Sequence, residues 1–223
     1  MKHLFSSVSV IAALLAAVPL QAQPSAAEAS QFTSLLPRDV RPVHYAIRLA
    51  PDPNAMRFSG HVEIGVDVLA PTSRIVVNAL DLDFKRAAVD GREARITVDG
   101  TAQTATLVLD RPLKVGRHSV VIDYDGKIGT QASGLFALDY QADGKPKRAL
   151  YTQFEAADAR RVFPGWDEPA YKATFTLDVD IGDADGIAVS NMPVASRTAL
   201  GSGRTRVSFD MTPKMASYLL FFA

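Results

Sequence analysis

The sequence predicts an all-β fold, an antiparallel and saddle-shaped β-sandwich, from three observations. From Pro42 onward, apolar residues recur with a period of two, which is the period of a strand with one buried face. Turn-forming residues separate the apolar segments at short intervals. No long amphipathic helix can be placed between residues 40 and 223. We therefore expect about a dozen strands joined by short hairpin connections.

Residues 1–22 are expected to be a secretory signal peptide, because Lys2 precedes an apolar run that ends in small and polar residues near Ala22. A buried N-terminal helix is the alternative, but it leaves the positive start and the small-residue exit unexplained. The apolar run spans roughly 13 residues, and a permanent transmembrane helix needs roughly 20. Residues 23–35 are expected to form a disordered leader. The sequence thus predicts a secreted or periplasmic protein with no transmembrane segment after signal cleavage.

Residues 36–223 are expected to form the β domain. The chain stops inside an apolar segment, residues 218–223, so we expect a chain truncated before a following domain. Apolar positions alternate with polar ones in three clear strands: Val62, Ile64, Val66 and Val68; Ala173, Phe175, Leu177, Val179 and Ile181; and Val207, Phe209 and Met211. Turns are expected at residues 51–54, 90–91, 99–100, 143–146, 185–186 and 201–203.

Composition excludes several classes of function. The chain has 24 Lys plus Arg and 24 Asp plus Glu, and no basic cluster, so nucleic acid is not expected as a partner. Without cysteine there is no disulfide, thiolate nucleophile or cysteine-based metal site. Phosphate-loop and serine-nucleophile motifs are also missing. His61 and Glu63 share one strand face, but no third ligand is visible, so a solvated strand face is favoured over a metal site.

Residues 151–169 concentrate polar groups in an otherwise regular β pattern. Gln153 and Glu155 stand at positions i and i+2, so an extended backbone points both side chains from the same face. An amide beside a carboxylate can hold an ammonium group. The alternative is structural: Glu155 could form a surface ion pair with Arg160 or Arg161, which would carry no function.

The end of the same window contains two adjacent carboxylates, Asp167 and Glu168, in a turn bracketed by prolines. They could form an acid and base pair, but capping of backbone N–H groups is the commoner role of such residues. Trp166, the single tryptophan, is expected to be a packing anchor.

The window from Thr152 to Phe175 resembles the N-terminal domain of the M1 (gluzincin) family of zinc aminopeptidases, whose pattern reads T-Q-x-E-x-x-x-A-R-x-x-F-P-C-x-D-E-P-x-x-K-A-x-F. The resemblance covers residues 36–223. It departs at Gly165, where the family usually has Cys, and at Trp166, where Phe is common. Neither position is catalytic in the family, so the departures concern local packing. Supporting matches lie at residues 36–49, 58–64, 134–136, 190–193 and 212–219.

The resemblance implies that hydrolysis occurs in a following domain. There, a Gly-Ala-Met-Glu-Asn segment binds the substrate amine, and a His-Glu-x-x-His helix with a later Glu holds one zinc ion. Neither motif occurs between Met1 and Ala223. We therefore expect this chain to contain no catalytic residue and no metal ligand, to be inactive alone, and to have its own C-terminal catalytic domain as partner.

The resemblance also implies roles for two residues of this chain. Gln153 would line the pocket for the first substrate side chain, and Glu155 would help hold the free α-amino group of a peptide. Three alternatives stay open: a non-catalytic scaffold or binding module of the same family, a bifunctional enzyme of the leukotriene-hydrolase type, and an extracellular carbohydrate or adhesion sandwich. Glu155 argues against the leukotriene-hydrolase type, which typically carries Gln there, and an unrelated sandwich leaves the motif unexplained.

Overall fold

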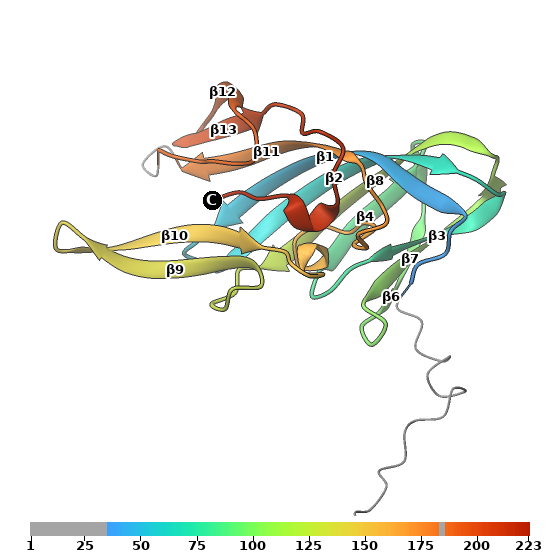
Figure 1. Cartoon of the computed structure of the whole chain (residues 1–223), viewed down its shortest axis with the longest axis horizontal. Coiled ribbons are helices and arrows are strands. Elements are labelled where there is room, and N and C mark those ends of the chain that lie inside the picture. The colour runs from blue at the N-terminus through green and yellow to red at the C-terminus, as the bar shows by residue number, and fades with distance from the viewer. Residues whose placement is uncertain (1–34, 183–185) are drawn as a thin grey trace, which may run out of the picture. The chain divides into compact units, whose positions relative to one another are not determined.

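The structure, a computed structural model shown in Figure 1, describes residues 35–182 and 186–223. The predicted signal peptide and the leader as far as residue 34 lie outside the described residues. The described part contains the strands β1 (Val40–Asp52), β2 (Arg57–Val68), β3 (Thr72–Asn78), β4 (Asp83–Val89), β5 (Arg92–Glu93), β6 (Arg95–Asp99), β7 (Thr104–Leu113), β8 (Gly116–Lys127), β9 (Gly134–Ala142), β10 (Lys145–Gln153), β11 (Thr174–Gly182), β12 (Val194–Gly201) and β13 (Arg204–Phe209), and the short 3-10 helices η1 (Ala159–Arg161) and η2 (Ser217–Leu219).

The strands form three open sheets, which confirms the predicted all-β class. The largest sheet has the order β12-β13-β11-β1-β2-β8-β4-β5, a second has the order β3-β7-β6, and β9 pairs with β10 alone. One pair departs from the antiparallel expectation, because β1 and β11 run parallel. Nine strands separate these two along the chain, and such a long connection permits parallel pairing where a hairpin turn does not.

The predicted alternation is clearest in β2. Val62, Ile64 and Val66 are fully buried, while the residues between them are at least partly exposed. The pattern in β13 is shorter than predicted, because the strand ends at Phe209 and the side chain of Met211 is exposed. The prediction is therefore confirmed for Val207 and Phe209 and is wrong for Met211, which belongs to the loop that follows.

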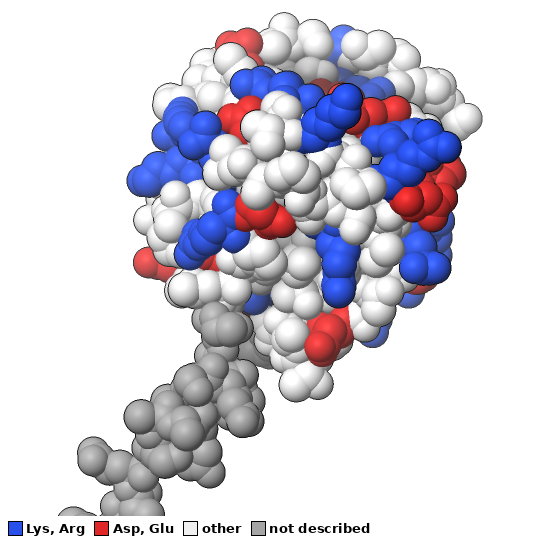
Figure 2. All heavy atoms as spheres, turned by 90° about the vertical axis from the view of Figure 1, so that its right-hand side faces the viewer, with Lys and Arg blue, Asp and Glu red and all other residues white. Residues whose placement is uncertain are grey.

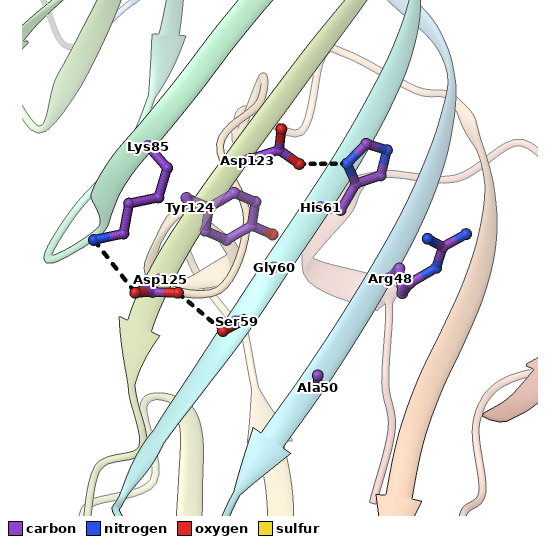
Figure 3. A pocket seen from close by; sticks show the side chains of 9 residues that line it. All are labelled: Arg48, Ala50, Ser59, Gly60, His61, Lys85, Asp123, Tyr124 and Asp125. Atoms are coloured by element: carbon purple, nitrogen blue, oxygen red, sulfur yellow. Dashed lines mark hydrogen bonds and ion pairs between the residues drawn. The ribbon is translucent and has the colours of Figure 1, made fainter. Parts of the chain in front are cut away.

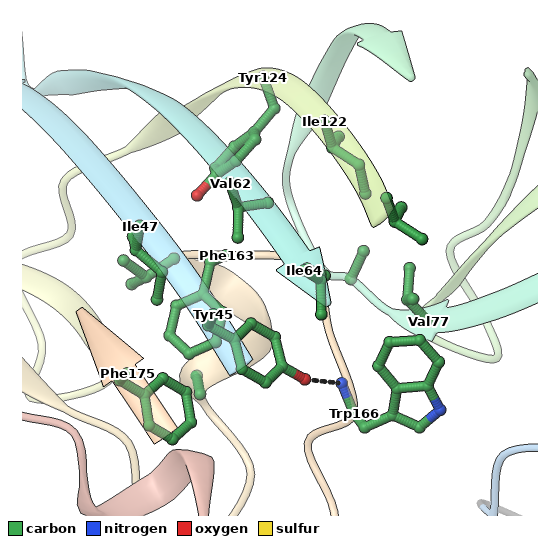
Figure 4. Packing of buried hydrophobic residues seen from close by; sticks show 14 of the residues in the cluster. Tyr45, Ile47, Val62, Ile64, Val77, Ile122, Tyr124, Phe163, Trp166 and Phe175 are labelled. Atoms are coloured by element: carbon green, nitrogen blue, oxygen red, sulfur yellow. Dashed lines mark hydrogen bonds between the residues drawn. The ribbon is translucent and has the colours of Figure 1, made fainter. Parts of the chain in front are cut away.

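The core lies between the sheets, and buried residues of the eight-stranded and three-stranded sheets belong to one hydrophobic cluster. Figure 4 shows its aromatic centre, in which Tyr45 of β1 stacks on Phe175 of β11 with ring centroids 4.8 Å apart. Phe163 meets both rings edge-on. Outside the core, the face in Figure 2 mixes positive and negative side chains. No helix among the described residues is long and apolar enough to cross a membrane.

The β9–β10 hairpin carries the motif window at its end and lies beside the main sheet in Figure 1. Its turn contains Asp143 and Gly144, both with positive φ (52° and 70°), as expected for a tight two-residue hairpin turn. Arg148 of β10 donates two hydrogen bonds to Asp139 of β9, at 2.6 and 2.8 Å. The same guanidinium donates to the carbonyl of Pro53, which ties the hairpin to the turn between β1 and β2.

Candidate functional site

Gln153 and Glu155 lie where β10 ends. Gln153 is its last residue, and both side chains are exposed, while Phe154 between them is buried. Phe154 packs edge-on against Phe163, with centroids 6.0 Å apart. The two residues are exposed and Phe154 is buried, as alternation along an extended chain predicts, although the strand ends at Gln153 and Glu155 lies in the turn that follows. The peptide bond between Glu155 and Ala156 is cis.

The two arginines that could neutralise Glu155 are engaged elsewhere. Arg160 pairs with Asp167 at 3.1 Å, and Arg161 pairs with Asp158 and Asp81 at 2.8 and 2.9 Å. Among the described residues, no ion pair or hydrogen bond involves the Glu155 side chain. The structural alternative, an ion pair with Arg160 or Arg161, is therefore wrong. The carboxylate is left exposed and available to a cation.

We call residues 154–173 the motif loop, and Asp167 holds it together from inside. Its carboxylate accepts hydrogen bonds from the Arg160 N–H at 3.2 Å, the Arg160 Nε–H at 3.1 Å and the Ser217 hydroxyl at 2.6 Å. Glu168 serves the other side, where it accepts the Leu36 N–H at 2.6 Å and lies 2.9 Å from Arg38. The two carboxylates thus have separate partners, and they anchor the loop instead of forming an acid and base pair.

Residues 165–167 of the motif loop are hydrogen-bonded to β1 and β3. Asn78 of β3 exchanges two backbone hydrogen bonds with Gly165 and accepts the Asp167 N–H through its side-chain oxygen. The Tyr45 hydroxyl accepts the Trp166 N–H at 3.0 Å, drawn as a dashed line in Figure 4. Trp166 is buried, which confirms it as a packing anchor. Burial also raises the pKa of Tyr45 far above its ordinary value, so its hydroxyl stays neutral.

The space beside Gly165 explains why this position, where the family pattern has Cys, carries no side chain. A Cβ at this position would lie 2.8 Å from Cε1 and 2.9 Å from the hydroxyl of Tyr45. The Tyr45 ring therefore takes the space that a side chain at position 165 would need. No local pattern indicates that Tyr45 fills this space, because the two residues are far apart in the chain.

The outer face of the main sheet carries the histidine considered as a metal ligand. His61 of β2 contacts Asp123 of β8 at 2.6 Å, and Glu63 accepts a hydrogen bond from the Ser119 hydroxyl at 2.8 Å. Figure 3 shows His61 joined to Asp123, and Lys85 joined to Asp125, in a pocket on this face. The other side chains lining that pocket include Arg48, Ser59, Lys85 and Asp125. No group of three or more His, Asp or Glu that could hold a metal ion occurs in residues 35–182 and 186–223.

Sequence reasoning missed three residues that support the site. Asn78, Thr152 and Ser217 are buried polar residues that hydrogen-bond to distant segments. The one local signal is at Asn78, a polar residue directly after the apolar run of β3. Thr152 is a fixed position of the family pattern, but the role of its hydroxyl, like that of Ser217, could be found only once its partner was known.

Comparison with known proteins agrees with this arrangement. The model of the peptidase M1 N-terminal domain matches residues 41–219, which is most of the chain. The chain belongs to the M1 peptidase family. It is 45% identical over 212 residues to aminopeptidase N of Acetobacter pasteurianus, covering 93% of this chain and 59% of that protein. It is 36% identical over 205 residues to aminopeptidase M1-C of Oryza sativa, covering 91% of this chain and 23% of that protein.

Fungal relatives give the same result. Aminopeptidase 2 of Candida albicans is 33% identical over 205 residues, which cover 91% of this chain and 22% of that protein. The M1 N-terminal domain described here thus spans less than two thirds of the length of these curated relatives. Each of the three relatives is named an aminopeptidase.

Proposed function

We propose that this M1 domain belongs to a zinc metallo-aminopeptidase that removes N-terminal amino acids from peptides, and that it supplies Gln153 and Glu155 to the substrate pocket. The observation that carries this proposal is the free Glu155 carboxylate. It is exposed, as is Gln153 two positions earlier, although two arginines stand five and six positions further along the chain and pair with other acids. A carboxylate kept without a counter-charge on a firmly anchored loop is suited to bind a cationic ligand.

An α-ammonium group is the cation that fits an exopeptidase. It would donate charge-assisted hydrogen bonds to Glu155, while Gln153 lines the pocket for the first side chain. A peptide bond inside a chain has no ammonium to offer, so binding it would leave the carboxylate desolvated and unpaired. The site would therefore select free N-termini.

Zinc chemistry would belong to another part of the enzyme. The described residues of this domain offer no set of ligands for a metal ion, so they do not fit a zinc site. We propose that the zinc ion and the hydrolytic residues lie in a C-terminal catalytic domain that is this domain's partner. On that proposal the domain alone has no peptidase activity. The greater length of the aminopeptidase relatives supports this division.

Steady-state kinetics of the complete enzyme test the role of Glu155. Glu155→Ala should raise KM for an aminoacyl-arylamide by about tenfold or more, since a hydrogen bond to a charged group is lost. Glu93→Ala is the matched control, because Glu93 of β5 is an exposed carboxylate that pairs with Arg86 of β4. Equal KM values for wild type, Glu155→Ala and Glu93→Ala would show that Glu155 does not bind the amine.

We also propose export of the protein to the periplasm or the exterior, directed by residues 1–22. The basic start and short apolar run of that segment support this localisation. N-terminal sequencing of the mature protein should find a start near Ala22. A mature protein that still begins at Met1 would contradict it.

A further inference from the structure

Thr152, the residue just before Gln153, is hydrogen-bonded to Phe222 near the end of the sequence. Thr152 donates two hydrogen bonds to the Phe222 carbonyl, one from its N–H and one from its hydroxyl, both at 3.1 Å. The Phe222 N–H donates back to the Thr152 Oγ1 at 2.9 Å. Both residues are buried, with 6% and 3% of their surface exposed. All three bonds join Thr152 to Phe222, which lies 70 positions further along the chain.

The hydrogen bonds between Thr152 and Phe222 stabilise the end of the β9–β10 hairpin that carries Gln153. The β9–β10 sheet has two strands, and a hairpin of two strands has little stability of its own. Thr152 and Phe154 are buried, while Gln153 and Glu155 are exposed. Phe154 contributes apolar packing against Phe163. Thr152 contributes the hydrogen bonds that fix the strand end, and these are directional where apolar packing is not.

We propose that Thr152 is a positioning residue, which holds Glu155 where it meets the substrate amine and Gln153 where it meets the first side chain of the substrate. This inference rests on the proposed function of Glu155. Thr152 itself touches no substrate, because its side chain is buried against Phe222. Its hydroxyl acts through the backbone: it fixes β10 one residue before the strand ends, and Gln153 and Glu155 follow one and three positions further along the chain.

The chain contains a matched control for these hydrogen bonds of Thr152. Thr212 is also buried and exchanges the same kind of bonds with Phe175: its Oγ1 accepts the Phe175 N–H at 3.0 Å and its N–H donates to the Phe175 carbonyl at 2.9 Å. Thr212 lies outside the β9–β10 hairpin. Thr152→Val and Thr212→Val therefore remove equivalent hydroxyls with the same change of shape, and only the first lies beside Glu155.

The test measures KM and kcat of the complete enzyme with an aminoacyl-arylamide, together with thermal unfolding. Thr152→Val should raise KM by about three- to tenfold with kcat little changed, because a small displacement of a binding group weakens substrate binding. Thr152→Ser keeps the hydroxyl and should restore KM to within about twofold of wild type. Thr212→Val should lower the melting temperature about as much as Thr152→Val and leave KM unchanged. Equal KM for the two valine variants, or failure of serine to rescue, overturns the inference.

A double variant separates this inference from the proposed function. If Thr152 acts through Glu155 and Gln153, then Thr152→Val should raise KM much less in the Glu155→Ala background than in the wild type, because only its effect through Gln153 remains. A full, multiplicative effect in that background would overturn the positioning role. If Glu155→Ala alone raises KM and Thr152→Val does not, the inference fails and the proposed function stands. If Glu155→Ala leaves KM unchanged, both fail.

Discussion

Replacement of Asp167 by Asn tests whether one buried carboxylate holds the motif loop in place. Asp167 and Arg160 are both largely buried, with 4% and 11% of their side chains exposed. Two N–H groups of Arg160 and the hydroxyl of Ser217 donate to the carboxylate. An asparagine keeps the shape of the side chain, but it carries no charge and turns one acceptor oxygen into a donor.

The expected loss is large because Arg160 would remain buried without its counter-charge. Removal of one partner from a buried ion pair costs about 3–5 kcal/mol. A domain of ordinary stability has about 5–15 kcal/mol in total, so Asp167→Asn should consume a large part of it. The same argument predicts little for Asp139→Asn. Asp139 pairs with Arg148 by two short hydrogen bonds, but 66% of its side chain is exposed to solvent.

Urea unfolding of the wild type and the two variants, followed by circular dichroism, measures both effects. The unfolding midpoint should fall strongly for Asp167→Asn and hardly at all for Asp139→Asn, with unchanged slopes of the transition. Equal midpoints for the two variants would refute the reasoning, because the pairs share residue types and differ mainly in burial.

Two further predictions concern packing and pH. Gly165→Ala should destabilise the domain by about 1–3 kcal/mol, because the new Cβ would clash with the buried Tyr45 ring. Gly100→Ala is the control: its Cβ would meet nothing within 4 Å, and it should change the free energy of unfolding by less than about 0.5 kcal/mol. Similar urea midpoints for the two variants would contradict this prediction. The hydrogen bond that the His118 ring donates to the Asp90 carboxylate raises the pKa of His118 above 6.5. The stabilisation from this pair is therefore complete at lower pH and is lost as pH rises through the folded pKa. The unfolding free energy of wild type relative to His118→Gln should accordingly decline as pH rises, and a gap that widens with pH would contradict the assignment.

Local patterns in the sequence predicted the local features of the structure. The period of two in β2 predicted which of its side chains are buried, because neighbouring side chains of a strand point to opposite faces. The turn at Asp143 and Gly144 followed from residues that tolerate positive φ. The exposure of Gln153 and Glu155 on either side of buried Phe154 matches the same alternation, although the strand itself ends at Gln153.

Contacts between distant segments could not be predicted in this way. The parallel pairing of β1 with β11 depends on which strands meet in space, and the period within each strand does not encode it. The bonds of Asp167 to Asn78 and Ser217 span 89 and 50 positions. The choice between a free and a paired Glu155 depended on these contacts as well, since Asp167 takes up the nearer arginine.

The most direct test of the central claim is a crystal structure of the complete enzyme with a bound peptide that has a free N-terminus. The account predicts that the α-ammonium nitrogen lies within about 3.2 Å of a Glu155 carboxylate oxygen, with Gln153 beside the first side chain. A bound peptide whose ammonium contacts other acids, while Glu155 faces solvent or pairs with an arginine, would contradict the account.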